Sequence, residues 1–357
     1  MAKFRKIGVL TSGGDAQGMN ACIKAVVHRA KELGIEVVGI NGGYAGLING
    51  DLVDLTYKKV ANIIGEGGTI LYSSRCPEFK TEEGLQTAIN TCRKNKIDAL
   101  VCIGGDGTFR GATDMTFRGI PSIGIPGTID NDITATDYTI GFDTSINKAV
   151  ELIDCLRDTT ESHARINIVE LMGRECGQIA LYAAIASGAV ACAIPELPFD
   201  EKGVIERILA HRAAGKRSMI VVVAEGLKTA DGRRYGEELC EKLTAIGLDT
   251  RFFRAAHVIR GGRPSVRDRV IAVQMGNCAV ECLVNGQSNL VVGVNDGKII
   301  TVDIAFALIA DRMYKNKLKD GDLDRFTPEQ IEDMKTLCEK RRAEIVALYE
   351  AVEHIAQ

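Results

Sequence analysis

Glycine-rich and acidic turns follow several apolar runs of the sequence, and the first has the composition of an anion cradle. It reads TSGGDAQG over residues 11–18 and leads into a helical pattern that begins with Met19 and Asn20. Glycine lets backbone N–H groups approach an anion, and the first turn of a helix carries partial positive charge. A plain tight turn explains one or two glycines, so this turn, with polar Asn20 behind it, favours phosphate binding.

The second turn is IGGDGT at residues 103–108, which places a carboxylate among glycines at the start of a helical pattern. A carboxylate repels phosphates unless a cation lies between them, and Mg²⁺ is usually held by one or two carboxylates together with phosphate oxygens. Asp106 is therefore a candidate Mg²⁺ ligand. The alternative is an aspartate that only caps the helix, which is common.

The third turn, PGTIDND at residues 126–132, carries Asp130 and Asp132 two positions apart in an extended segment, so both point to one side. A hydroxyl that attacks a γ-phosphate needs a proton acceptor, and a loop aspartate supplies one. Alone, this turn is better explained as an Asx-rich turn. Because parallel strands end at one edge of a sheet, we expect the three turns to meet there and to form a phosphoryl-transfer site.

Further residues that suit a phosphorylated substrate, most of them arginines, lie near other predicted strand ends. Arginine stays charged and binds phosphate bidentately, although a surface ion pair is the default interpretation of any single one. The candidates are Arg75 in a polar loop, Arg165 and Arg174 on either side of one strand, Glu225 after another strand, and Arg251, His257 and Arg260 in the segment after it.

Short β-branched runs alternate with longer helical patterns along the chain. Near-continuous apolar strands between amphipathic helices indicate the α/β class, with a mostly parallel sheet covered on both faces. We expect strands at 6–11, 36–40, 99–103, 122–125, 166–171, 219–224 and 290–294, and helices at 19–33, 83–94, 145–157, 177–186, 203–214 and 267–285.

The overall composition of the 357 residues excludes several classes of protein. With 44 basic and 47 acidic side chains the net charge is −3, and without basic runs there is no footprint for nucleic acid or anionic lipid. No apolar stretch approaches the ~20 residues that span a bilayer, and the first residues lack a signal-peptide pattern. The 11 cysteines form no CxxC pair. We therefore expect a cytoplasmic protein with reduced thiols and no membrane or nucleic-acid partner.

The last 31 residues predict one amphipathic helix. Thr327-Pro328-Glu329-Gln330 is a capping box with proline at the first helical position. The apolar face of this helix is predicted to be a docking surface. It comprises Met334, Cys338, Ile345, Leu348, Val352 and Ile355.

In this order, the motifs TSGGDAQGMN, SSRCPEF, IGGDGT, PGTIDND, YTIGFDT, RINIVELMGR and HVIRGG resemble the bacterial 6-phosphofructokinase family. The resemblance runs from Lys6 to about Val294. It implies ATP-dependent phosphorylation of fructose 6-phosphate at its 1-hydroxyl, with Mg²⁺, as a step of glycolysis. It also implies two similar three-layer α/β/α domains with mostly parallel sheets. We expect a larger ATP-binding domain at 1–141 with 259–310, a smaller sugar-binding domain at 142–258 with 311–327, and a helical extension at 328–357.

The resemblance also implies roles for individual residues. Asp130 would accept the proton, and Thr128 and Asp132 would assist at the metal and the phosphoryl group. Arg75 and Arg174 would stabilise the charge on the transferred group. Asp106 would hold Mg²⁺. ATP would contact Gly13, Arg75, Cys76, Gly105, Asp106, Gly107 and Thr108. The sugar phosphate would contact Thr128, Ile129, Asp130, Arg165, Met172, Gly173, Arg174, Glu225, Arg251, His257, Val258, Ile259 and Arg260.

Two further consequences concern subunits and the phosphoryl donor. In the family, the residues that match Arg165 and Arg251 reach in from a neighbouring subunit, which implies a homotetramer, or a homodimer, with a shared active site. Pyrophosphate-using relatives carry aspartate at the position of Gly107 and lysine at that of Gly127. An aspartate at Gly107 would crowd and repel the α-phosphate of a nucleotide, so the two glycines favour ATP over the alternative, a pyrophosphate-dependent phosphofructokinase.

Some positions depart from the family pattern. Gln17 replaces a more usual proline, and Lys24, His28, Tyr57 and Val190 differ from the usual residues of the effector pocket, so the resemblance leaves allosteric control undecided. A lipid or NAD kinase shares GGDGT but has no reason to carry PGTIDND and HVIRGG. A catalytically silent regulatory subunit is the third alternative, but it would be expected to have lost Asp106, Asp130 or Arg174.

Overall fold

The computed structural model describes residues 4–356, and the chain divides into two compact units. The larger unit comprises the residues up to Ile129 together with Ile133–Asp143 and Arg260–Cys338. The smaller unit comprises Asp130–Asp132, Thr144–Ile259 and the residues from Glu339 onward. Within the described part of the chain, every helix is too short or too polar to cross a lipid bilayer.

The larger unit is built on a seven-stranded sheet in the order β11-β10-β5-β4-β1-β2-β3. Its five inner strands are parallel, and the two edge strands pair antiparallel with their neighbours. Every residue of β4 and β5 is buried, as expected for strands that are covered on both faces. The strands are β1 Lys6–Ser12, β2 Glu36–Ile40, β3 Leu52–Asp54, β4 Ala99–Gly104, β5 Ser122–Pro126, β10 Leu290–Asn295 and β11 Lys298–Asp303.

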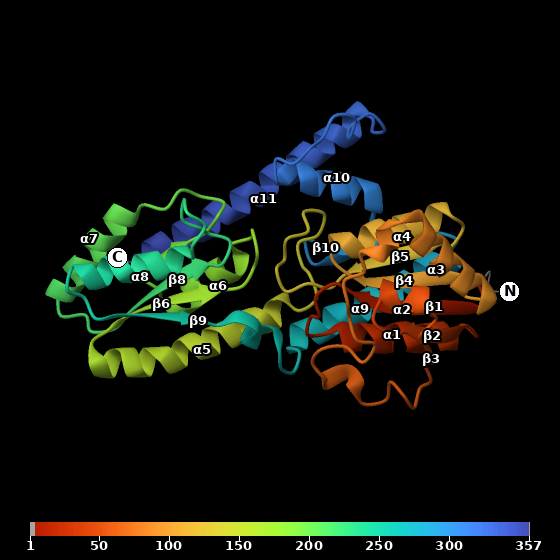
Figure 1. The fold of residues 1–357 in the computed structure, drawn as a ribbon, viewed down its shortest axis with the longest axis horizontal. Helices are drawn as coiled ribbons and strands as arrows, with labels where there is room; N and C mark the ends of the chain where they lie inside the picture. The colour runs from red at the N-terminus through yellow and green to blue at the C-terminus, as the bar shows by residue number, and fades with distance from the viewer. Residues whose placement is uncertain (1–3, 357) are drawn as a thin grey trace. The chain divides into compact units, whose positions relative to one another are not determined.

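Helices cover both faces of this sheet, and alternate residues of its strands point to opposite faces. Leu100 and Cys102 of β4 pack with side chains of α3 and α4, whereas Ile103 faces α1. Helices α1 and α9 approach each other closely (Figure 1). A Cβ at Gly276 of α9 would lie only 2.9 Å from the Cβ of Ala25 of α1, so the absence of a side chain at Gly276 permits this approach. The helices are α1 Met19–Glu32, α2 Tyr44–Asn49, α3 Glu82–Lys94, α4 Asp106–Phe117, α9 Val266–Val284 and α10 Ile304–Tyr314, with short 3-10 helices η1 Ile63–Gly65 and η2 Glu78–Lys80.

The smaller unit has a parallel four-stranded sheet in the order β7-β8-β6-β9. The two inner strands are fully buried and form its core with Val204, Ile208, Leu239 and Leu243. Its elements are α5 Phe142–His163, which begins in the larger unit, β6 Ile166–Leu171, α6 Gln178–Ser187, β7 Ala191–Ala193, α7 Glu201–Ala213, β8 Met219–Ala224, α8 Tyr235–Ala245, β9 Thr250–Arg254 and η3 Ala256–Arg260, whose last residue belongs to the larger unit.

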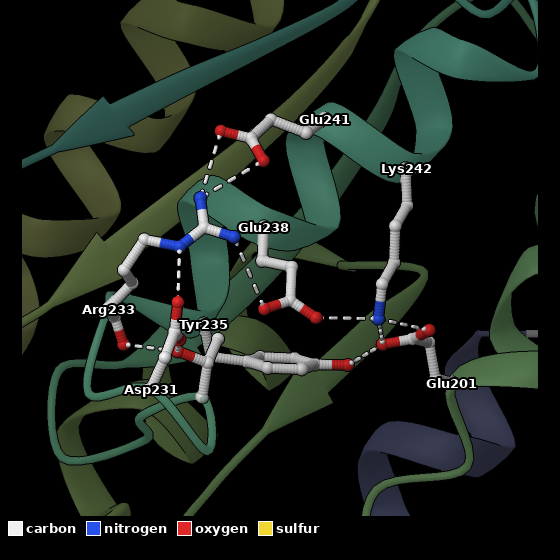
Figure 2. Close-up of polar contacts among 8 residues, drawn as sticks. Glu201, Asp231, Arg233, Tyr235, Glu238, Glu241 and Lys242 are labelled. Carbon is white, nitrogen blue, oxygen red and sulfur yellow. Dashed lines mark hydrogen bonds and ion pairs between the residues drawn. The ribbon is translucent and has the colours of Figure 1, made fainter.

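A polar network joins α7, α8 and the loop before α8 on the smaller unit (Figure 2). The Tyr235 hydroxyl donates to the Glu201 carboxylate, and Lys242 Nζ lies 2.9 Å from the same carboxylate. Arg233 binds Asp231 and Glu241 on the neighbouring surface. These contacts attach α8 to the start of α7.

The terminal helix α11, Pro328–Ile355, begins where the capping box predicts. The backbone N–H of Thr327 donates to Gln330 Oε1, and the N–H of Gln330 donates to Thr327 Oγ1. The units differ from the expected domains in three respects. Residues 311–327 belong to the larger unit, Asp130–Asp132 belong to the smaller unit, and α11 is divided between the units after Cys338 and is not a separate extension. Of the expected docking face, Met334 packs on α10 and Cys338, Ile345 and Val352 are also buried, whereas Ile355 is 45% exposed.

Candidate active site

The glycine-rich turn after β1 is bonded to the loop that carries Arg75. Gly13 has a φ of 88°, which is the left-handed conformation that glycine adopts most readily. Its backbone N–H donates to the carbonyl of Ser74 over 3.3 Å, and its carbonyl accepts a 2.7 Å hydrogen bond from the Ser73 hydroxyl. The fold therefore brings the loop that carries exposed Arg75 and half-buried Cys76 next to Gly13.

The turn after β4 lies beside the turn after β1. Thr108 Oγ1 donates to the carbonyl of Ser12 over 3.2 Å, so this predicted ATP contact links the two turns. Asp106 is half-buried and is the first residue of α4, where the helix dipole favours anions. A Cβ placed on Gly105 or Gly107 would meet no atom of the protein within 4 Å. Both glycines thus line open space at a helix N-terminus, which suits a phosphate group.

The two glycines that bear on the choice of donor have different surroundings. Gly107 is exposed and open, whereas a Cβ on Gly127 would lie 2.9 Å from Met19 Cε and 3.0 Å from Ile103 Cγ2. Gly127 also donates its N–H to the carbonyl of Gly104. A side chain at Gly127 therefore disturbs the packing of the protein itself, while one at Gly107 affects only what binds in front of it.

Two polar residues near these turns form hydrogen bonds to backbone groups of the protein. The side chain of Asn20 donates to the carbonyls of Glu66 and Gly67 and accepts from the N–H of Ile70, so it holds the loop at residues 66–70. Arg260 belongs to the larger unit, and its guanidinium donates to the carbonyl of Asp15 over 2.7 Å. It is therefore placed next to the first glycine-rich turn.

In the smaller unit, the carboxylate of Asp130 is fully buried and pairs with Arg174. Arg174 Nε lies 3.2 Å from Asp130 Oδ2, and the arginine side chain is 53% exposed. A buried carboxylate is costly unless a partner stabilises its charge, and Arg174 provides that charge. Of the neighbouring predicted residues, Thr128 and Ile129 are buried in the larger unit, and Asp132 is half-buried in the smaller unit.

The predicted phosphate arginines Arg165 and Arg251 share a carboxylate that the sequence analysis missed. Arg165 Nε lies 2.9 Å from Asp249 Oδ2, and Arg251 Nη1 lies 2.7 Å from Asp249 Oδ1. The hydrogen bond from Arg165 and the charge of Arg251 lower the pKa of Asp249. Asp249 thus keeps two cations together before β9.

The remaining predicted sugar contacts lie at two strand ends of the smaller unit. Met172 and Gly173 follow β6, and Glu225 follows β8, where its Oε1 accepts from the N–H of Arg174 over 3.1 Å. In η3, His257 and Val258 are exposed, while Ile259 is fully buried.

The residues that differ in the expected effector pocket have partners of their own. Lys24 Nζ donates to the carbonyls of Val60 and Ala61, and the ring of His28 packs edge-on against Tyr57 with centroids 4.8 Å apart. Burial and the charge of Lys24 lower the pKa of His28. Val190 is buried in the smaller unit.

No group of three or more histidine, cysteine, aspartate or glutamate side chains in residues 4–356 is arranged to hold a metal ion. A single carboxylate fits Mg²⁺ that arrives with a nucleotide, because the phosphates then supply further ligands. Asp106, half-buried at the start of α4, is the candidate for this ligand.

The comparisons with known proteins agree with the family resemblance of the sequence motifs. A family model described as phosphofructokinase matches residues 6–283. The ATP-dependent 6-phosphofructokinase of Clostridium tetani is 48% identical over 315 residues, which are 88% of this chain and 97% of that protein. That of Clostridioides difficile is 49% identical over 311 residues, 87% of this chain and 96% of that protein.

Solved structures of similar fold include phosphofructokinase from Saccharomyces cerevisiae, with a TM-score of 0.82 and 31% identity. The match covers 93% of this chain and 50% of the yeast chain, so this chain spans half the length of that relative. A pyrophosphate-dependent phosphofructokinase from Nitrosospira multiformis has a TM-score of 0.77 at 22% identity, over 85% of this chain and 84% of that chain, and shares the fold.

Proposed function

Because the chain belongs to the phosphofructokinase family, we propose that it is an ATP-dependent 6-phosphofructokinase. It transfers the γ-phosphate of ATP to the 1-hydroxyl of fructose 6-phosphate and yields ADP and fructose 1,6-bisphosphate, a step of glycolysis. The similarity to ATP-dependent enzymes at 48% and 49% identity supports this choice of donor. The observation that carries the proposal is the buried Asp130 carboxylate paired with Arg174.

The larger unit binds the nucleotide. The turns at Gly13 and Gly105 contact the phosphates, and Arg75 adds a positive charge. Exposed Gly107 leaves room for the nucleotide because it has no side chain. Asp106 holds Mg²⁺, which neutralises phosphate charge when it is bound with ATP.

Asp130 is the proton acceptor. Transfer of the γ-phosphate needs a carboxylate that orients the attacking hydroxyl and takes its proton. Arg174 Nε lies 3.2 Å from Asp130 Oδ2 and supplies the positive charge that a buried carboxylate needs. Half of the Arg174 side chain is exposed, so the same guanidinium is available to stabilise charge on the transferred group.

The smaller unit binds the sugar phosphate. Met172, Gly173 and Glu225 contact the sugar. Arg165 and Arg251, which Asp249 holds together, bind the 6-phosphate with His257 and Arg260. By family analogy the two arginines serve the active site of a neighbouring subunit, so we propose a homotetramer. The cytoplasmic location remains a prediction from the sequence.

The test is a product assay of the purified full chain with fructose 6-phosphate and Mg²⁺, run in parallel with ATP and with pyrophosphate. We expect ³¹P NMR to show fructose 1,6-bisphosphate and ADP with ATP, and little turnover with pyrophosphate. Equal or faster turnover with pyrophosphate would establish the alternative donor. Absence of the bisphosphate with both donors would refute the proposed function.

A further inference from the structure

The loop that carries Arg174 is held at both ends by carboxylates from other strand ends. It runs from Gly173 to Gly177 between β6 and α6, and its first two residues have φ values of 144° and 53°. A non-glycine residue such as Arg174 adopts the left-handed conformation only when its surroundings impose it. The position of the Arg174 guanidinium on Asp130 therefore depends on what holds this backbone.

At the first end, Glu225 Oε1 accepts hydrogen bonds from the N–H groups of Gly173 and Arg174, at 3.4 and 3.1 Å. At the second end, Glu196 Oε1 accepts from the N–H of Gly177 at 2.8 Å. Between them, the N–H of Cys176 donates to the carbonyl of Gly173 and closes a turn. The loop is thus fixed by one carboxylate on either side of a hydrogen-bonded turn.

The contact between Glu196 and Gly177 is tight and largely removed from water. A Cβ on Gly177 would lie 2.5 Å from the Cβ of Ile194 and 2.8 Å from Glu196 Oε2, so only glycine fits between them. Burial raises the pKa of the Glu196 carboxyl group. Burying a carboxyl group here costs stability, and its hydrogen bond from the Gly177 N–H offsets part of that cost.

We infer that Glu196 is a positioning residue for phosphoryl transfer. It holds the Gly173–Gly177 loop so that the Arg174 guanidinium stays paired with the Asp130 carboxylate. This inference rests on the proposed function. Glu196 accepts the N–H hydrogen bond through Oε1, an atom that glutamine retains and alanine lacks. The role therefore requires an acceptor oxygen at this place and does not require a negative charge.

A matched control lies on the next helix of the same unit. Asp200 Oδ1 accepts from the N–H of Gly203 at 3.0 Å, the same type of bond at the start of α7. Asp200→Ala removes a carboxylate from a helix start without touching the Arg174 loop. It controls for a general loss of stability.

The experiment compares Glu196→Ala, Glu196→Gln and Asp200→Ala in the full chain by steady-state kinetics and hydrogen exchange. We expect Glu196→Ala to lower kcat at least tenfold with the KM for ATP nearly unchanged, and Glu196→Gln to stay within about threefold of wild type. Asp200→Ala should lower the melting temperature and leave kcat unchanged. In an Arg174→Ala background, Glu196→Ala should add less than a threefold further loss, because both changes remove the same interaction.

The outcomes separate this inference from the proposed function. If wild type makes fructose 1,6-bisphosphate but Glu196→Ala keeps its kcat, or if the two losses multiply, the positioning role is wrong and the proposed function stands. If wild type makes no bisphosphate, the proposed function fails, and hydrogen exchange still decides the structural part. The amides of residues 174–177 should exchange faster in Glu196→Ala and not in Asp200→Ala, and equal exchange in both variants would overturn the inference.

Discussion

Replacing Gly107 with aspartate should weaken ATP use without harming the fold. A Cβ at this position meets no protein atom within 4 Å, and the residue is exposed in the first turn of α4. The added side chain therefore displaces nothing in the protein. A carboxylate near a helix N-terminus is also favourable, and aspartate has a slightly higher helix propensity than glycine. We expect the melting temperature to stay the same or rise.

The added carboxylate should weaken the binding of the nucleotide by repelling its phosphates. Two like charges ~4 Å apart repel by about 1 kcal/mol in water and about 4 kcal/mol near a protein surface. Since 1.4 kcal/mol corresponds to a factor of ten, Gly107→Asp should raise the KM for ATP by roughly 5-fold to 1,000-fold. The KM for fructose 6-phosphate, which is assigned to other residues, should change little.

The assay is a coupled measurement of fructose 1,6-bisphosphate formation over a range of ATP concentrations, with thermal unfolding measured on the same preparations. Gly107→Asn is the matched control, because it adds almost the same volume without the charge and isolates crowding from repulsion. An unchanged KM for ATP in Gly107→Asp would refute the assignment of this space to the nucleotide. A fall in melting temperature would refute the claim that the position is open.

Three further predictions follow from other parts of the structure. Arg251→Ala should raise the KM for fructose 6-phosphate at least tenfold and leave that for ATP unchanged, since the residue is assigned to the sugar phosphate; a defect confined to ATP would contradict the assignment. Gly127→Ala should lower the free energy of unfolding by about 1–3 kcal/mol in urea titrations, because its Cβ would crowd Met19 and Ile103, and unchanged stability would show that the site can expand. Burial raises the pKa of Glu201, but hydrogen bonds from Tyr235 and Lys242 outweigh it and leave that pKa below its ordinary value of 4.5 (Figure 2). The ionised Glu201 therefore stabilises the folded state above pH 4.5, and this stabilisation is lost as the pH falls through the lowered pKa. The melting temperature of wild type should exceed that of Glu201→Gln at pH 7, and the two melting temperatures should converge below pH 4.5. A difference that stays constant with pH would contradict the lowered pKa.

The inner strands were the easiest elements to predict. The expected strands 36–40, 166–171 and 219–224 coincide with β2, β6 and β8, because strands in the interior of a parallel sheet are continuous apolar runs. The edge strands β3, β7, β9 and β11 were missed. They are short or partly exposed, and β9 (TRFFR) has arginines where an inner strand would have apolar residues.

The candidate site was predictable where its chemistry lies at strand ends. Gly13 and Asp106 follow buried strands, and the Thr108–Ser12 hydrogen bond brings their turns together. Asp249 and Glu196 were not predictable, because their partners Arg165 and Gly177 are 84 and 19 residues away in sequence and only the fold brings them close.

The measurement that tests the central claim most directly is the turnover of Asp130→Ser with ATP, Mg²⁺ and fructose 6-phosphate, together with equilibrium dialysis of fructose 6-phosphate. The account predicts that kcat falls by about 10²–10⁴-fold, the usual scale of lost acid–base catalysis, while the Kd of the sugar phosphate changes by less than about threefold. A kcat within tenfold of wild type would contradict the role of Asp130 as the proton acceptor.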